Sequence, residues 1–122
     1  MSRTEQLTKL IKQLSTTTPD VEAAAIVDND GLIIASSLPQ GIEEEGVAAM
    51  TAALLGISER IASELSRGEF EMVMIKGGHG YAVITRSGPE SVLAVLTTQN
   101  AKLGLIFMDV KRTCKEIARI LS

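Results

Sequence analysis

The spacing of apolar side chains predicts a helix near each end of the chain. At the start, Leu7, Leu10, Ile11 and Leu14 recur at three- and four-residue spacing, which places them along one side of a helix. Pro19 lies beyond this segment and ends the helical pattern. Toward the end of the chain, one helical face carries Leu103, Ile106, Phe107, Val110, Cys114, Ile117 and Leu121.

Five short runs between these helices predict strands. Residues 21–27 and 32–36 are joined by an Asp-Asn-Asp-Gly segment, which predicts a β-hairpin with a positive φ at Gly31. The remaining runs occupy residues 70–76, 81–86 and 91–97. Short, turn-rich segments link these three runs. Their neighbours must therefore be antiparallel, because a parallel pair needs a crossover of about a dozen residues.

A long helix is predicted between the second and third strands. Three consecutive glutamates, starting at Glu43, suit a helix N-terminus, where negative charge is stabilised. We expect the helix to run to Arg67 and to stop at Gly68, the kind of residue that often ends a helix. Its expected core stripe consists of Val47, Met50, Leu54, Ile57, Ile61 and Leu65.

The last three strands predict how the layers stack. Both of their alternating sets of side chains are largely apolar, as in Met72 and Met74 against Val73 and Ile75. A strand that is apolar on both faces needs cover on both faces. We therefore predict an α/β (α+β) fold, a three-layer α/β/α sandwich around a five-stranded antiparallel sheet, with residues 1–122 as a single domain.

Composition and charge narrow the class of protein. Apolar residues make up 45% of the chain, which is enough for one core, and the net charge of −3 argues against a nucleic-acid partner. The single cysteine, Cys114, excludes an internal disulfide. The first residues lack a signal-peptide pattern, and no apolar run reaches the ~20 residues of a membrane span. We expect a cytoplasmic protein with no direct membrane insertion.

No group of residues predicts catalysis, a cofactor or a metal ion. The only histidine, His79, lies in a glycine-rich turn, where a general base is conceivable and an exposed turn residue is the simpler interpretation. Cys114 falls on an apolar helical stripe, so a buried structural thiol is expected. The Asp-Asn-Asp-Gly segment is not a calcium loop, because Ile26 would occupy its first ligand position. We predict no enzyme activity, no cofactor and no metal.

A second face of the long helix predicts an interface. Small residues there would let another helix approach closely; alternatively, alanine is present only because it favours helices. Gly56 supports the first interpretation, because glycine inside a helix costs about 1 kcal/mol relative to alanine. The third strand has no proline and no inward-pointing charge in its middle, so a copy of the chain could pair with it. The predicted dimer interface is Ala49, Ala52, Ala53, Gly56, Arg60, Ser63, Met72, Val73, Met74 and Ile75.

The chain as a whole resembles the Roadblock, or dynein light chain, family. The resemblance rests on the order of elements, the hairpin 25–35, the long Ala-rich helix and the Leu103-Gly104-Leu105 start of the last helix. Asp28, Gly31 and Gly104 are the structural turn residues that it implies. It further implies a profilin-like fold with sheet order 2-1-5-4-3 and a homodimer with a continuous ten-stranded sheet.

The resemblance also implies a function. Prokaryotic members similar to the gliding-motility regulators bind a Ras-like small GTPase and modulate its nucleotide cycle, and eukaryotic members are adaptors. A non-catalytic scaffold that regulates such a GTPase, with or without stimulating GTP hydrolysis, is therefore expected. Arg60 and Arg67 are not interpreted as arginine fingers on position alone. The alternative is a small-molecule sensor of the PAS or profilin-like kind, although only Phe70, Tyr81 and Phe107 are available to line its cavity.

Overall fold

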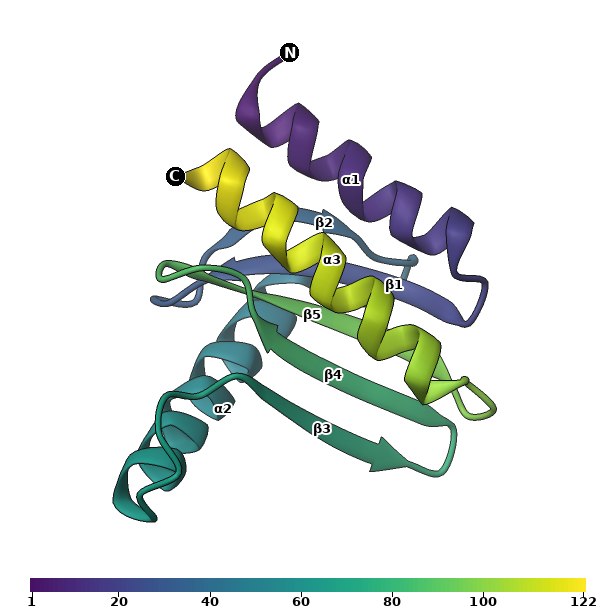
Figure 1. The fold of residues 1–122 in the computed structure, drawn as a ribbon. Coiled ribbons are helices and arrows are strands. Elements are labelled where there is room, and N and C mark those ends of the chain that lie inside the picture. Colours follow the sequence, from purple (N-terminus) through teal and green to yellow (C-terminus); the bar gives the residue numbers. More distant parts are fainter.

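A computed structural model describes residues 1–122, and its helices and strands follow the predicted order (Figure 1). The elements are α1 (Arg3–Thr17), β1 (Val21–Asp28), β2 (Ile33–Ser37), α2 (Glu44–Glu64), β3 (Met72–Gly77), β4 (Gly80–Arg86), β5 (Ser91–Thr98) and α3 (Leu103–Leu121). None of the helices has the length and apolarity needed to cross a bilayer.

The five strands form one antiparallel sheet in the order β2-β1-β5-β4-β3, which confirms the predicted order. The central strand, β5, pairs with β1 on one side and β4 on the other. Helices α1 and α3 cover one face of the sheet, and α2 alone covers the other (Figure 1). The predicted three-layer α/β/α sandwich is confirmed.

Alternate residues of the central strands supply two separate cores. In β1, Ala24 and Ile26 join α1 and α3 in a cluster of 13 buried residues. Ala25 and Val27 point to the other side and join α2 in a cluster of only 7 buried residues. The strands are apolar on both faces, as the sequence predicted, but the two sides are filled unequally.

The β1–β2 hairpin is fixed by its turn chemistry. Oδ1 of Asp28 accepts hydrogen bonds from the backbone N–H groups of Asp30 at 2.9 Å and Leu32 at 3.0 Å. Gly31 has φ +89°, which confirms the predicted positive φ, and a Cβ atom there would lie 3.3 Å from Cβ of Ala52. The hairpin turn therefore packs closely against α2. Gly104, by contrast, lies in the first turn of α3, where an added Cβ would meet nothing.

The end of α2 differs from the prediction. The helix stops at Glu64, three residues before the predicted Arg67, because Ser66 adopts a left-handed φ of 56°. The N–H of Ser66 then bonds to the carbonyl of Ser63 at 3.1 Å and the N–H of Arg67 to that of Ala62 at 2.7 Å. This is the Schellman pattern, with serine at the position usually taken by glycine.

The predicted core stripe of α2 was wrong at Met50, Ile57, Ile61 and Leu65, which are exposed, whereas Val47 and Leu54 are partly buried against the core. The buried residues of the helix are Ala48, Thr51 and Leu55, and none beyond Leu55 is buried. Small side chains at 48 and 51 let the helix backbone lie close to the sheet, so the larger apolar side chains are turned to its flank. The C-terminal half of α2 projects away from the strands (Figure 1).

Candidate functional site

The chain offers little reactive chemistry. It has no group of three or more His, Cys, Asp or Glu side chains that could hold a metal ion. His79 is exposed in the tight turn between β3 and β4. Burial raises the pKa of the Cys114 thiol to about 12, because the thiolate would be poorly solvated there, so the group stays protonated near neutral pH. The candidate site is a surface formed by β3 and α2.

The first part of that surface is the free edge of β3. This strand pairs only with β4, and most of its residues are exposed. The N–H of Arg86 bonds to the carbonyl of Glu71 at 2.9 Å, and hydrogen-bonded pairs alternate along an antiparallel ladder. The backbone N–H and C=O groups of Met72, Met74 and Lys76 therefore point away from the sheet, free to pair with another strand.

The second part is a flank of α2, which we call the apolar flank. It consists of Met50, Ile57, Ile61 and Leu65, whose exposed fractions are 69%, 58%, 53% and 64%. Fully burying one such side chain stabilises an assembly by about 1.5–3 kcal/mol. Four of them along one helix are more than scattered surface residues, and exposed groups of large apolar side chains are common at interaction sites.

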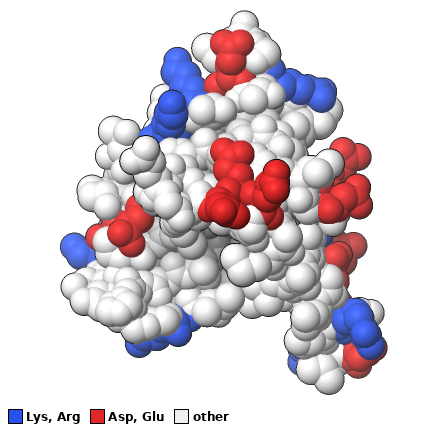
Figure 2. Space-filling view, turned by 180° about the vertical axis from the view of Figure 1, so that it is seen from behind, with Lys and Arg blue, Asp and Glu red and all other residues white.

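The edge and the apolar flank lie on the same side of the sheet. Val73 of β3 and Leu54 of α2 both pack on the α2-side cluster, and Ile75 follows Val73 on the same side by strand alternation. Ile75 is 49% exposed. Figure 2 views this side, where carboxylates gather in the upper half and uncharged atoms fill the area beside the projecting end of α2.

The predicted interface residues fall into two groups. Met72, Val73, Met74 and Ile75 lie together on the free edge. On α2, the small-residue face lies about a third of a turn from the apolar flank, and its members Ala49, Ala53, Gly56, Arg60 and Ser63 are exposed while Ala52 is half-buried against Gly31. Arg60 pairs with Glu64 on its own helix at 3.1 Å. Sequence reasoning missed the apolar flank because it assigned those residues to the core.

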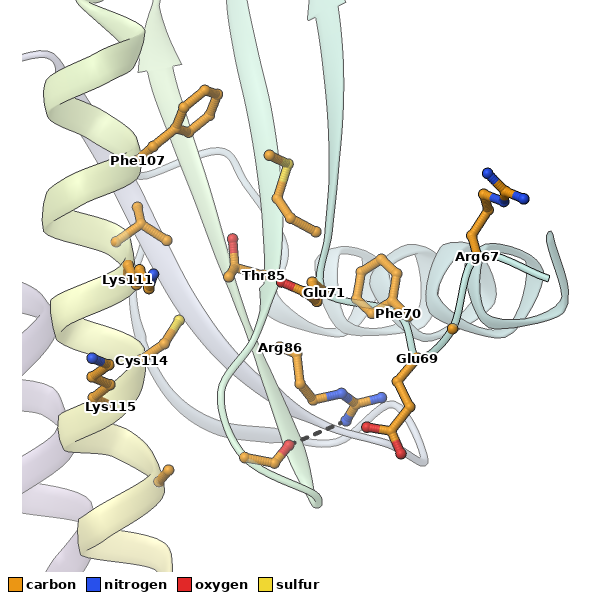
Figure 3. A pocket seen from close by; sticks show the side chains of 15 residues that line it. Arg67, Glu69, Phe70, Glu71, Thr85, Arg86, Phe107, Lys111, Cys114 and Lys115 are labelled. Carbon is orange, nitrogen blue, oxygen red and sulfur yellow. Dashed lines mark hydrogen bonds between the residues drawn. The ribbon is translucent and has the colours of Figure 1, made fainter. Parts of the chain in front are cut away.

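The other side of the sheet also has an uncovered part. Between α3 and the outer strands β4 and β3 lies a groove of about 800 Å³ (Figure 3). Met72 and Thr85 contribute to its lining from the strands, and Phe107 and Cys114 from α3. We call it the α3 groove. It shares the strand β3 with the first surface but opens on the opposite side.

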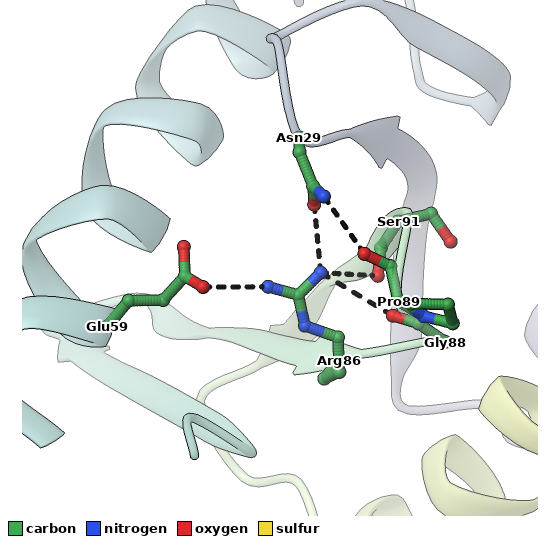
Figure 4. A network of polar contacts seen from close by, with 6 residues as sticks. All are labelled: Asn29, Glu59, Arg86, Gly88, Pro89 and Ser91. Carbon is green, nitrogen blue, oxygen red and sulfur yellow. Dashed lines mark hydrogen bonds and ion pairs between the residues drawn. The ribbon is translucent and has the colours of Figure 1, made fainter. Parts of the chain in front are cut away.

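A half-buried arginine links α2 to one end of the sheet. Arg86 Nη2 lies 3.3 Å from Glu59 Oε2 on α2, and its Nη1 donates to Asn29 Oδ1 at 2.8 Å (Figure 4). The same nitrogen lies near the carbonyls of Gly88 and Ser91. The Arg86 side chain is 21% exposed and that of Glu59 is 52% exposed, so solvent partly screens the ion pair. The network ties α2 to both turns at this end.

Comparisons with known proteins agree on the family. Residues 7–97 match the family model described as the Roadblock/LC7 domain. Two uncharacterised proteins of Methanocaldococcus jannaschii, MJ1340 and MJ0310, are each 40% identical over 100 residues, which is 82% of this chain and 87% of theirs.

Solved structures agree on the fold. Myxococcus xanthus MglB superimposes with a TM-score of 0.91 at 21% identity, covering 99% of this chain and 91% of that chain. A Roadblock/LC7 domain from Streptomyces avermitilis has a TM-score of 0.72 at 28% identity, covering 92% of this chain and 98% of that one.

Proposed function

The chain belongs to the Roadblock/LC7 family, and from this premise we propose that it is a homodimeric scaffold that binds and regulates a Ras-like small GTPase. The scaffold contributes no catalytic residue of its own. Its effect on the GTPase comes from where it binds, either as an activator of GTP hydrolysis or as an adaptor. One observation carries the proposal: an unpaired strand edge and an exposed apolar helix flank lie on the same side of one sheet.

Both parts of the surface serve the same symmetric contact. If the β3 edges of two copies pair antiparallel with Met74 at the two-fold axis, Met72 of one copy lies opposite Lys76 of the other. All the outward backbone groups of the strand are then paired. The axis runs perpendicular to the joined sheet, so α2 of each copy lies on the same face, and the two apolar flanks can bury each other.

The small-residue face of α2 has a different role in this arrangement. It lies about a third of a turn around the helix from the flank, so in this arrangement it remains open along the outer side of the helix pair. Ala49, Ala53 and Gly56 leave room for a close approach by a helix of another protein. We place the GTPase on the paired helices and the loops beside them. If the dimer instead uses the small-residue face, Gly56→Leu will separate the copies and substitutions on the flank will not.

The proposal is tested with the purified chain and the Ras-like GTPase encoded in the same genome. Binding is measured by fluorescence anisotropy of the GTPase loaded with a fluorescent GDP or with a non-hydrolysable GTP analogue. A scaffold of this kind binds one nucleotide state more tightly than the other. Single-turnover GTP hydrolysis with and without the chain separates activator from adaptor. Absence of binding in both nucleotide states contradicts the proposed partner, whereas a monomeric chain contradicts the proposed dimer.

A further inference from the structure

The α3 groove is a half-open channel that the chain does not fill itself. Helix α3 packs on α1, β5 and β4, which leaves the same side of the edge strand β3 without a covering helix. Thr85 pairs with Leu93 across the ladder and therefore faces this side, and Met72 lies opposite Thr85 on β3. Met72 is 42% exposed. In Figure 3, the side chains of Phe107 and Cys114 point from α3 toward these strands.

The helical wall of the groove has the dimensions of a helix-binding surface. Its apolar residues Phe107, Val110, Cys114 and Ala118 follow one side of α3 at three- and four-residue spacing. From Phe107 to Ala118 the wall is about 17 Å long, or about three helical turns. A second helix laid along it would be held between α3 on one side and the apolar surface of the strands below.

The rim of the wall is basic. Lys111 and Lys115 line the groove one turn apart, are exposed, and form no ion pair. The other cations of α3 are already engaged, Arg112 with Asp109 and Arg119 with Glu116.

The far end of the groove is lined by both positively and negatively charged side chains. Arg67, Glu69 and Glu71 line it there, and Arg86 belongs to the network with Glu59. Two free lysines along a helical wall stand out in a chain whose net charge is −3. They favour an occupant with carboxylates at matching spacing.

The floor contains one unsatisfied group. Oγ1 of Thr85 is buried and has no hydrogen-bond partner. Leaving such a group unpaired costs about 1–3 kcal/mol. Rotation about χ1 exchanges the hydroxyl and the methyl group of threonine, so a polar group of an occupant can reach it. The floor of the groove therefore offers a hydrogen-bonding group that the chain itself leaves unused.

We propose that the α3 groove binds an acidic amphipathic helix of a partner protein. The apolar face of that helix packs on the half-buried Phe107 and Ala118 and on the exposed Met72, and its carboxylates lie opposite Lys111 and Lys115. A concave channel suits a single helix better than a membrane surface, which needs a flat or convex contact. The groove lies on the opposite side of the sheet from the apolar flank, so its occupant is distinct from the proposed GTPase. It is formed within one copy of the chain and does not require the dimer.

The test uses a designed probe and a matched pair of variants. The probe is a fluorescein-labelled helical peptide of about 14 residues, long enough for the three-turn wall, with leucines at positions i, i+3 and i+7 and glutamates on its flanks. A second peptide carries lysine in place of each glutamate. The variant is K111E/K115E. Its control, K9E/K12E, makes the same change in net charge on the exposed side of α1, away from the groove.

The proposal predicts binding of the acidic peptide to the unmodified chain and to K9E/K12E, and about tenfold weaker binding to K111E/K115E. Added salt weakens the first two complexes, and ¹⁵N amide shifts on binding map to α3 and β4. Three outcomes overturn it: no binding of the acidic peptide, equal loss in both double variants, or shifts confined to α2. Tight binding of the unmodified chain to phosphatidylserine vesicles, lost in K111E/K115E while the peptide does not bind, overturns it in favour of a lipid surface. Light scattering on K111E/K115E measures its oligomeric state, so that a loss of the dimer is not mistaken for a loss of peptide binding.

Discussion

The two sides of the sheet bury their helices to different extents. On one side, α1 and α3 enclose a cluster of 13 buried residues that includes Leu7, Ile11 and Ile117, each with no exposed surface. On the other, α2 contributes only Ala48 and Leu55 to a cluster of 7 and leaves the side chains of Met50, Ile57, Ile61 and Leu65 exposed. On the first side the apolar stripes of α1 and α3 are largely buried within the chain, and only the α3 groove stays open. On the second side most of the large apolar side chains of α2 are exposed. Because α2 leaves large apolar side chains exposed, it is the part of the molecule to test for association with another chain.

The largest effect on stability is expected on the enclosed side. Ile11→Ala removes a fully buried side chain from a well-packed cluster and should lower the free energy of unfolding by about 2–5 kcal/mol. Ile57→Ala on the apolar flank is the matched control, and in the monomer it should change stability by less than about 0.5 kcal/mol. Urea unfolding at low protein concentration measures both. Equal losses would show that α2 is packed as tightly as α1.

For dimer formation we expect the opposite, namely that substitutions on the apolar flank have a larger effect than substitutions in the enclosed core. Ile57→Glu and Ile61→Glu place a charge in the middle of the apolar flank, and together they should raise the dimer dissociation constant by about 100-fold or more. Gly56→Leu lies on the neighbouring small-residue face and should change the dimer dissociation constant by less than about threefold. Analytical ultracentrifugation compares the variants, with circular dichroism as the check on folding. Dissociation caused by Gly56→Leu alone would move the interface to the small-residue face.

Two proline substitutions in β3 separate the free edge from the paired one. Met74→Pro removes an N–H that points outward, so it should weaken the dimer by about tenfold and leave the β3–β4 ladder intact. Ile75→Pro removes an N–H that pairs with Ala82 and should lower monomer stability by about 1–3 kcal/mol. Amide hydrogen exchange across β4 distinguishes the two results. If Met74→Pro disrupts the β3–β4 ladder, the assignment of outward groups is wrong.

The arginine network should matter for the orientation of α2. Arg86→Ala removes the link between the helix and both turns, and we expect a loss of about 1–2 kcal/mol. Glu59→Gln keeps a hydrogen-bond acceptor and should cost less. Thermal unfolding at matched concentration measures the loss, and ¹⁵N relaxation shows whether the C-terminal half of α2 gains mobility. If the mobility of α2 is unchanged in Arg86→Ala, the packing of Leu55 and its neighbours positions the helix without the arginine.

The smallest effect is a pH dependence on the enclosed side. Burial raises the pKa of Cys114 from 9.0 to about 12, so the unfolded chain loses this proton before the folded one does. The contribution of the Cys114 thiol to the free energy of unfolding is fully present below pH 9 and is lost as the pH rises toward about 12. At pH 10 the loss should be about 1 kcal/mol. Cys114→Ala should show a shallower decline above pH 9 in urea unfolding; parallel declines would contradict it.

Most of the fold could be predicted from the sequence, because its strongest signals are local. The stripe of α1, the Asp28–Gly31 turn and the short links between the last three strands each specify one geometry. The end of α2 could not be predicted in this way. Ser66 adopts a left-handed conformation that sequence rules reserve for glycine, and its Schellman bonds to Ser63 and Ala62 appear only in three dimensions.

The candidate site was harder to predict, since periodicity shows that a helix has an apolar stripe but not what covers it. Met50 and Ile57 have core spacing, yet the sheet is covered through Ala48 and Thr51 because small residues allow the closer approach. The free edge of β3 was predicted from its composition and the family resemblance. Which of its backbone groups point outward follows only from the register with β4.

The central claim is that the free β3 edge and the apolar flank of α2 form one symmetric interface. Light scattering coupled to size exclusion tests it most directly, on the unmodified chain and on Ile57→Glu/Ile61→Glu at micromolar concentration. The account predicts twice the chain mass of 13.0 kDa for the first and a single chain mass for the second, with unchanged helix content. A monomer in both cases, or a dimer that survives the double substitution, would contradict it.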